Sequence, residues 1–188
     1  METTVNGYAV IPAGKFDGPG PHLRRWWMPE SETLTFHERH FDLRAGAMGF
    51  ILMHFILWFH ETIEHLDVNK VWDEWGHAVR PVRGQTVGYS NHAGGGAADL
   101  NSVMHPRGAA PSKSFSVRQM RNIRLWLQTA KYAGTLAWGG DWRLPDGMHV
   151  EITSVSMKRI KKVARALAKT PRGKRILAAN PGVNPKFP

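Results

Sequence analysis

The sequence predicts a single α+β domain, in which helices flank a small antiparallel sheet and a basic C-terminal helix and tail follow. Three segments favour this class. Residues 45–59 have the composition of a buried helix, residues 148–154 alternate apolar and polar side chains as a strand does, and residues 157–169 have the two faces of an amphipathic helix. Segregated helices and short strands are typical of α+β domains. The length of 188 residues suits one domain.

The N-terminal segment, residues 1–40, is predicted to be an irregular lead-in. It contains the turn cluster Gly18-Pro19-Gly20-Pro21 and a Trp26-Trp27 pair that is either exposed or docked on the domain. Its first 15 residues lack a basic start followed by an apolar run, so no secretory signal is expected.

The stretch 45–59 contains 15 residues, and His54 is the only one of them that is clearly polar. A membrane-spanning helix needs about 20 apolar residues, which favours a helix buried in a core; an interfacial or spanning segment is the alternative. The helix is expected to begin near Asp42 and to end near Asp67. Residues 68–83 are mixed in character and predict a strand that leads into a loop.

The second half of the chain predicts two helices and a strand. Ser116 and Gln119 form a capping-box pattern, which indicates a helix over residues 117–133 closed by Gly134. Residues 138–142 are expected to form a loop and residues 148–154 a strand. From Pro171 onward the chain is predicted to be a tail punctuated by Pro and Gly.

Charge divides the chain at residue 158. The formal net charge is +10, yet the residues before 158 hold as many cations as acids, whereas residues 158–188 hold ten Lys and Arg and no acid. We therefore expect one domain over residues 1–157 and a basic helix and tail over 158–188. The basic segment either attracts anionic polymers or a membrane surface, or docks on the domain and displays solvated lysines. Nucleic-acid binding through it is a further alternative, although no base-reading motif supports specific binding.

The residue types available for chemistry are limited by the absence of cysteine. The sequence contains no Cys and 10 His, so disulfide scaffolds, Cys-based zinc sites and thiol nucleophiles are excluded, and a metal site must use His, Asp and Glu. The segment His60-Glu61-Thr62-Ile63-Glu64-His65 resembles the HExxH helix of zinc proteases, but its histidines are one residue too far apart. On a helix such side chains lie about 140° apart, so we expect polar residues at a helix end.

Two other segments supply a complete set of groups for metal-dependent hydrolysis. In the first, His92 and Asp99 flank three consecutive glycines, which allow a loop to curl both side chains toward one point. In the second, Asp146 lies three residues before His149 at the start of the predicted strand. A hydrolytic zinc site needs three protein ligands and a nearby carboxylate that accepts a proton from water. His92, Asp99 and His149 are the candidate ligands, and Asp146 is the candidate base.

These segments resemble a known family. Ser90, His92, Gly95, Ala97 and Asp99 fit the pattern SxHxxGxAxD, and Trp138-Gly139-Gly140-Asp141-Trp142 followed by Asp146 and His149 is similar to the WxGGDW…DxxH region of the same family. The family is that of the zinc D-alanyl-D-alanine carboxypeptidases and L-alanyl-D-glutamate endopeptidases, especially its phage endolysins. Residues 80–84 also resemble the arginine-containing stretch that precedes this loop in such endolysins.

The resemblance implies that the small sheet carries a zinc site bound by His92, Asp99 and His149. It implies that Asp146 is the catalytic acid and base and that Arg80 lies near the substrate's carbonyl or carboxylate, with Arg83 as the competing arginine. Two positions depart from the family pattern: many members have Glu at the position of Asp146, and endolysins commonly have Pro at the position of Met148.

The resemblance further implies a bacteriolytic zinc metallopeptidase that hydrolyses an amide bond in the peptidoglycan stem peptide, as phage endolysins do. A D,D-carboxypeptidase or D,D-endopeptidase acting on the same stem is the alternative. Such an enzyme is made in the host cytoplasm and acts at the cell wall after release, where the basic segment would meet anionic wall polymers or the membrane surface.

Four residues have both a functional and a structural interpretation. Glu151 lies two residues from His149 on the predicted strand, so it either orients that ligand or is a solvated carboxylate. Ser90 and Asp141 are of interest through the family pattern, but each could cap a loop. Trp138 either packs a loop or contacts substrate.

Overall fold

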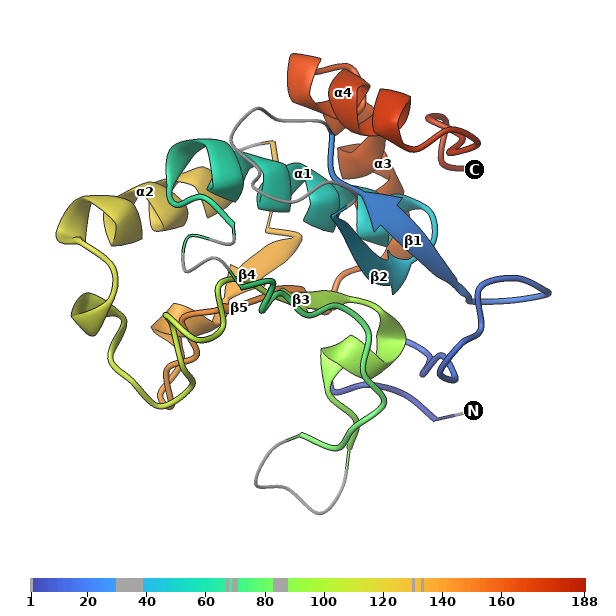
Figure 1. The fold of residues 1–188 in the computed structure, drawn as a ribbon. Coiled ribbons are helices and arrows are strands. Elements are labelled where there is room, and N and C mark those ends of the chain that lie inside the picture. The colour runs from blue at the N-terminus through green and yellow to red at the C-terminus, as the bar shows by residue number, and fades with distance from the viewer. Residues whose placement is uncertain are drawn as a thin grey trace.

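The computed structural model describes residues 2–29, 39–66, 68, 71–82, 88–129, 131–132 and 134–188. They form a mixed α+β domain with small antiparallel sheets, which confirms the predicted fold class (Figure 1). In chain order the elements are β1 (Leu23–Trp27), β2 (His40–Arg44), α1 (Ala47–Thr62), η1 (Asn91–Gly94), β3 (Ala97–Asp99), η2 (Pro111–Lys113), α2 (Val117–Leu127), β4 (Leu136–Trp138), η3 (Gly139–Asp141), β5 (His149–Ile152), α3 (Met157–Leu167) and α4 (Pro171–Ala179).

Helix α1 is the centre of the core, as the composition of residues 45–59 predicts. Every residue from Ala47 to His60 is buried, because β1 and β2, the second sheet, and helices α3 and α4 pack around it (Figure 1). Gly49 permits the close approach of β1, since a Cβ there would lie 2.4 Å from Nε1 of Trp26 and collide with the backbone of Arg44. None of the helices in the described part of the chain is long and apolar enough to cross a membrane.

Two antiparallel sheets flank this helix. Strands β1 and β2 form a two-stranded sheet, and β3, β5 and β4 form a three-stranded sheet in that order. In the second sheet Asp99 is directly opposite His149. Opposite residues in an antiparallel pair lie about 5 Å apart and project to the same face, so this register brings two of the predicted ligands together.

The first half of the chain corrects three predictions. Residues 23–27 are not part of an irregular lead-in but form β1, where Trp26 is fully buried against α1. The long helix begins after Gly46, not near Asp42, because residues 40–44 pair with β1, and it ends at Thr62, before the predicted end near residue 67. The described residues between 68 and 82 make only isolated bridges, such as that of Trp75 with Asp99, and no strand.

The second half confirms the capping box and the strand before α3. Ser116 and Gln119 cap α2 reciprocally as predicted, but the helix ends at Leu127, and residues 130 and 133 lie outside the described residues. Trp138 belongs to β4 and is not in a loop, because it pairs with Val150 of β5. Strand β5 confirms the alternating segment, with its bounds at His149 and Ile152.

The C-terminal segment is more ordered than its composition suggests. Helix α3 lies where the amphipathic pattern predicts it and buries its apolar face, made of Ile160, Val163, Ala164 and Leu167. The prediction of a tail from Pro171 is wrong, because Pro171–Ala179 form α4. Thr170 caps this helix by accepting a hydrogen bond from Gly173 N at 3.0 Å, and proline suits the first helical position, where no amide partner is needed.

Candidate metal centre

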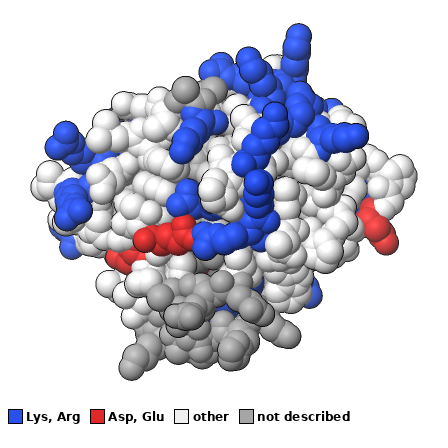
Figure 2. Space-filling view, turned by 90° about the horizontal axis from the view of Figure 1, so that it is seen from above, with Lys and Arg blue, Asp and Glu red and all other residues white. Residues whose placement is uncertain are grey.

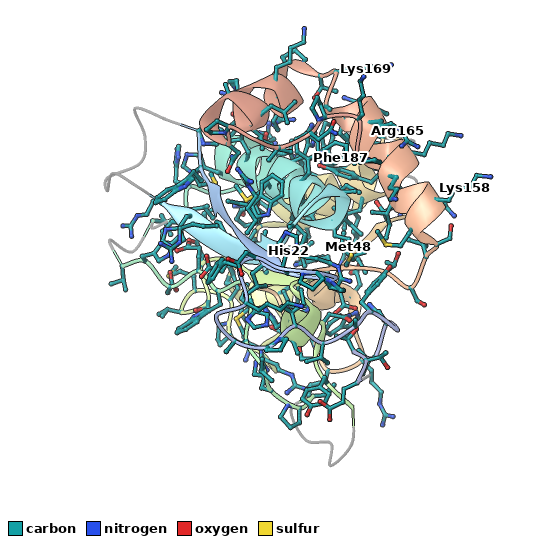
Figure 3. The ribbon with its side chains drawn as sticks, turned by 90° about the vertical axis from the view of Figure 1, so that its right-hand side faces the viewer. His22, Met48, Lys158, Arg165, Lys169 and Phe187 are labelled. Atoms are coloured by element: carbon teal, nitrogen blue, oxygen red, sulfur yellow. The ribbon has the colours of Figure 1, made fainter. Side chains whose placement is uncertain are left out.

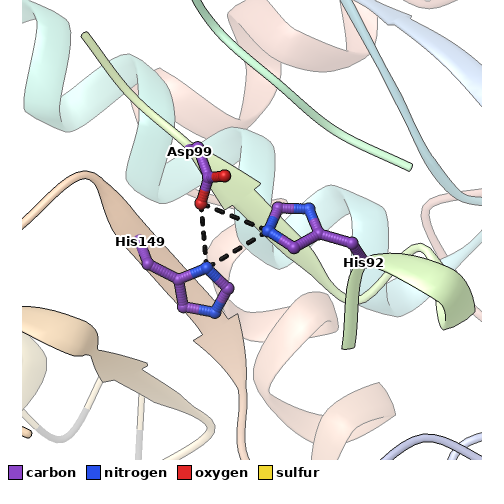
Figure 4. A group of neighbouring side chains, drawn as sticks. All are labelled: His92, Asp99 and His149. Carbon is purple, nitrogen blue, oxygen red and sulfur yellow. Dashed lines mark hydrogen bonds and ion pairs between the residues drawn. The ribbon is translucent and has the colours of Figure 1, made fainter. Parts of the chain in front are cut away.

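Three buried side chains from three separate elements converge on one point beside β5 (Figure 4). His149 Nδ1 lies 2.8 Å from Asp99 Oδ1. His92 Nε2 lies 3.2 Å from the same carboxylate oxygen and 3.2 Å from His149 Nδ1. One ligand atom from each residue lies within 4.8 Å of the others. The structure therefore brings together the three predicted metal ligands.

The backbone explains this convergence. Asp99 and His149 face each other across the β3–β5 pair, and His92 lies in the short helix η1 immediately before β3. Ser90 caps η1, with its hydroxyl accepting from His92 N at 3.4 Å. Gly95, in the left-handed conformation at φ 64°, ends η1 and turns the chain into the strand.

The second nitrogen of each imidazole is held by an acceptor. His92 Nδ1 donates to Gly76 O at 2.5 Å, so in the neutral ring Nε2 carries the lone pair and faces the cluster. His149 Nε2 donates to Glu151 Oε2 at 3.0 Å, which leaves Nδ1 toward Asp99. Such outer partners fix the tautomer and the ring orientation of metal-binding histidines. Glu151 thus holds the ring of His149 in place and is not a solvated carboxylate.

Glu151 is itself held in place by two asparagines. Asn91 Nδ2 donates to its Oε2 at 2.7 Å, and Asn6 Nδ2 donates to its Oε1 at 3.0 Å. Neither asparagine was among the residues predicted from the sequence. Asn91 adjoins His92 in the glycine-rich loop, but no sequence signal connects Asn6 with residue 151, because the contact spans 145 positions.

The charges of the cluster favour a cation. Burial alone would raise the pKa of Asp99, but His92 and His149 outweigh it and hold that pKa well below its usual range. Burial alone would lower the pKa of His149, but Asp99 and Glu151 raise it to about 9. Two imidazoles and a carboxylate, closed in by a second carboxylate, are a donor set that suits zinc. The residues present therefore fit the implied metal.

Asp146 lies beside this cluster on the turn that leads into β5. It is 7% exposed, and its Oδ1 has no hydrogen-bond partner. Burial raises its pKa; His149 and Arg107 act in the opposite direction, while Asp99 adds to the increase. The turn is packed against Gly139, where a Cβ would lie 2.6 Å from Asp146 O. This close approach explains why glycine follows Trp138.

Two cavities adjoin the cluster and share Arg80, Arg107 and Met148. One, of about 260 Å³, is also lined by Asp146, His149 and Glu151. The other, of about 480 Å³, is also lined by His92 and Asp99. The three clustered side chains and the carboxylate of Asp146 thus border open space.

Two arginines frame this space. Arg80, predicted from the sequence, has a guanidinium nitrogen 3.8 Å from Asp99 Oδ2. Arg107 was not predicted: its Nε lies 3.8 Å from Asp146 Oδ2. No motif contains Arg107, and only the folding of the 101–110 segment over the site reveals it. Arg83, the competing candidate, lies outside the described residues.

The remaining candidates divide between packing and the cavity wall. Trp138 is buried, and its Nε1 donates to Gly147 O at 2.7 Å, so it supports the turn that carries Asp146. Trp142 lines the cavity, and its ring centroid is 5.0 Å from that of His149. Asp141 pairs with Arg124 at 2.8 Å.

The HExxH-like segment takes no part in the cluster. His60 is buried in α1, where its Nδ1 accepts from Leu66 N at 3.0 Å. Glu61 pairs with Arg172 of α4 at 2.8 Å. This agrees with the expectation of polar residues at a helix end.

Comparison with known proteins supports the class that the cluster suggests. Residues 83–152, a little more than a third of the chain, match a family model described as D-alanyl-D-alanine carboxypeptidase, of the M15 peptidases. The matched segment contains the three clustered residues and Asp146 but not Arg80. No curated protein and no solved structure matches the chain. The match supports a peptidoglycan-acting peptidase, and the His92–Asp99–His149 cluster fits the metal site of a metallopeptidase.

Proposed function

We propose that this protein is a zinc-dependent peptidase that hydrolyses an amide bond in the peptidoglycan stem peptide. The observation that carries the proposal is the convergence of His92, Asp99 and His149 within 4.8 Å, next to a cavity lined by the buried carboxylate of Asp146. The family match over residues 83–152 supports the same substrate class.

The three clustered residues would hold the metal. Zinc would supply a Lewis acid that polarises the scissile carbonyl and makes water more acidic at neutral pH. Glu151 keeps the ring of His149 oriented, and the Gly76 carbonyl does the same for His92.

Asp146 is suited to move the proton. Its Oδ1 has no hydrogen-bond partner, and burial raises its pKa. A carboxylate in this state can accept a proton from water and return it to the leaving amine, a role worth about 10²- to 10⁴-fold in rate. Arg80 and Arg107, on the cavity wall, supply positive charge for the oxyanion or for a carboxylate of the substrate.

Two bonds of the stem peptide are candidates. The motif resemblance to phage endolysins favours an L-alanyl-D-glutamate or related endopeptidase that lyses the host cell, made in the cytoplasm and active at the wall. The family model that matches is described as D-alanyl-D-alanine carboxypeptidase, which favours the alternative of a D,D-carboxypeptidase or D,D-endopeptidase. Both reactions use the same ligands and the same base.

Mass spectrometry of purified peptidoglycan digested with the protein tests the proposal and separates the two bonds. Cleavage that a chelator abolishes and zinc restores is expected. A new amino terminus on D-glutamate identifies the endopeptidase, whereas released D-alanine identifies the carboxypeptidase. Asp146→Asn is the inactive control. Stem peptides left intact by folded, zinc-loaded protein would contradict the proposal.

A further inference from the structure

The exposed side of α3 carries a continuous row of cations. Lys158, Lys162 and Arg165 are exposed, and at 100° per residue they fall within about 60° of arc on the helix. Lys161 extends this row on one side, and Lys169 follows the end of the helix. Figure 3 shows Lys158, Arg165 and Lys169 pointing outward along α3. We call Lys158, Lys161, Lys162, Arg165 and Lys169 the cationic stripe.

Among the described residues, the stripe has no carboxylate partner. In the part of the chain that the structure describes, none of the five side chains forms an ion pair. Arg165 donates instead to the backbone carbonyls of Lys186 and Phe187, each at 3.2 Å. Lys and Arg side chains gather on the face seen in Figure 2, where few acidic side chains are visible. This surface can therefore attract anions.

The opposite, apolar side of α3 is not available for insertion into a lipid bilayer. Ile160, Val163, Ala164 and Leu167 are buried, and α3 packs on α1. An amphipathic helix that binds a bilayer buries such an apolar face among the lipids. Here the core already occupies that face, so binding by the stripe must depend on charge.

The stripe is long and narrow. A helix of 11 residues is about 16 Å long, and a cavity of about 370 Å³ adjoins it, lined by His22, Arg24 and Lys161 among others. A compact anion can reach one or two cations of such a row. A linear polymer can contact them all, and the release of its counterions favours binding.

We propose that the cationic stripe binds a linear anionic polymer of the bacterial cell wall and holds the enzyme on its insoluble substrate. The preference for a linear polyanion depends on the stripe alone, while the assignment to the wall rests on the proposed function. The stripe lies across α1 from the strand that carries His149 (Figure 1). A bound polymer therefore leaves the cavities beside the metal centre open.

The experiment compares two triple variants of the full chain that carry the same change in net charge. K158E/K162E/K169E alters exposed positions of the stripe, and K113E/R118E/R121E alters exposed positions on η2 and α2. Binding is measured with long-chain polyphosphate, and with purified cell walls before and after removal of their anionic polymers. Anionic vesicles and duplex DNA are compared with polyphosphate at equal phosphate concentration.

The stripe variant should bind polyphosphate and intact walls at least about tenfold more weakly at low salt, and its log–log salt dependence should become less steep by about three. The control variant should stay close to the original protein, and walls without anionic polymer should bind poorly. Equal loss in both variants, stronger binding to vesicles or DNA than to polyphosphate, or no binding at all would overturn the inference.

Hydrolysis of a soluble stem peptide separates this inference from the proposed function. The stripe variant should cleave the soluble peptide at the original rate and intact walls more slowly. Polymer binding without any hydrolysis would refute the proposed function but leave the polyanion site intact. Hydrolysis of both substrates at the original rate would refute the role of the stripe on the wall.

Discussion

The candidate metal centre and the cationic stripe are built in opposite ways. The metal centre is buried, takes its residues from three elements, and surrounds two imidazoles with the carboxylates of Asp99 and Glu151. The stripe is exposed, comes from a short continuous segment, and has cations without carboxylate partners among the described residues. The buried cluster fits a cation in a fixed geometry, whereas the proposed role of the stripe is to attract anions without a fixed geometry.

This difference predicts how each region responds to substitution. Contacts in the buried cluster depend on one another, so a single change should abolish its chemistry. Charges in the stripe act over a distance and are screened by salt, so single changes there should have small, additive effects. The stripe variants described above test the exposed side of this contrast, and the following predictions, in order of decreasing effect, test the buried side.

His149→Ala should cause the largest loss. It removes one of three ligands and leaves the carboxylates of Asp99 and Glu151 without the imidazole between them. Bound zinc, measured by elemental analysis after dialysis, and peptide hydrolysis should both fall to background. The matched control His105→Gln changes a buried histidine that lies outside the cluster. A His149→Ala protein that retains stoichiometric zinc would show that the cluster is not the metal site.

Asp146→Asn should separate binding from catalysis. Asp146 is not among the clustered ligands, so zinc content should be unchanged, whereas turnover should fall by about 10²- to 10⁴-fold because the proton acceptor is lost. Zinc content and the rate of hydrolysis are measured on the same preparation. Near-normal turnover would make Glu151 the next candidate for the base.

Arg107→Met should lower kcat/KM, because it removes a positive charge from the wall of both cavities. Arg107 lines both cavities and lies beside Asp146, so kcat/KM should fall by about tenfold to a hundredfold, as when a charged hydrogen bond is lost. Arg124→Met, which affects a surface ion pair with Asp141, is the control. Equal kinetics for the two variants would exclude Arg107 from the substrate site.

Ile160→Ala should show that apolar burial attaches the C-terminal layer, formed by α3 and α4, to α1. Ile160 is fully buried, so its truncation should lower the free energy of unfolding by about 2–5 kcal/mol. Glu61→Gln, which weakens the ion pairs with Arg172 and Arg175, should cost no more than about 1 kcal/mol. Urea denaturation gives both values. The opposite order would mean that ion pairs hold this layer.

Over a single pH unit, the smallest effect is the pH dependence of stability at the contact between α1 and α4. Burial, assisted by Arg172 and Lys131, lowers the pKa of His54 to about 3. His54 bonds to Tyr132 and Thr170, at 3.0 and 3.1 Å. Below an unfolded pKa of about 6.5, the unfolded chain takes up a proton that the folded state resists, so His54 destabilises the fold as pH falls.

Proton uptake by His54 in the unfolded chain should lower the free energy of unfolding by about 1.4 kcal/mol for each pH unit below about pH 6. His60, with a pKa lowered by burial to about 4, acts in the same direction. Urea denaturation of the original protein and of His54→Gln at neutral and mildly acidic pH measures the slope, which should be shallower in the variant. Equal slopes would contradict the assignment to His54.

The elements that the sequence predicted well depend on local chemistry. The capping box of Ser116 and Gln119, the alternation in β5 and the amphipathic pattern of α3 all act within a few residues, and each marks the element that the structure contains. Asp99 and His149 could be selected because a glycine-rich loop and a DxxH segment carry the residue types of a hydrolytic site. The strand at residues 23–27 and the helix at residues 171–179 could not be predicted in this way, because tertiary packing outweighs the effect of their Pro- and Gly-rich surroundings.

By itself, the sequence determined the fold class, the residue types of the candidate metal centre and the concentration of positive charge after residue 157. Only the tertiary structure decided that Glu151 orients His149, that Asn6 supports Glu151 and that Arg107 faces Asp146. It also decided that the apolar face of α3 is buried in the core. The physical reason is distance along the chain, because local patterns specify backbone conformation and residue type, whereas contacts between remote segments depend on how the whole core packs around α1.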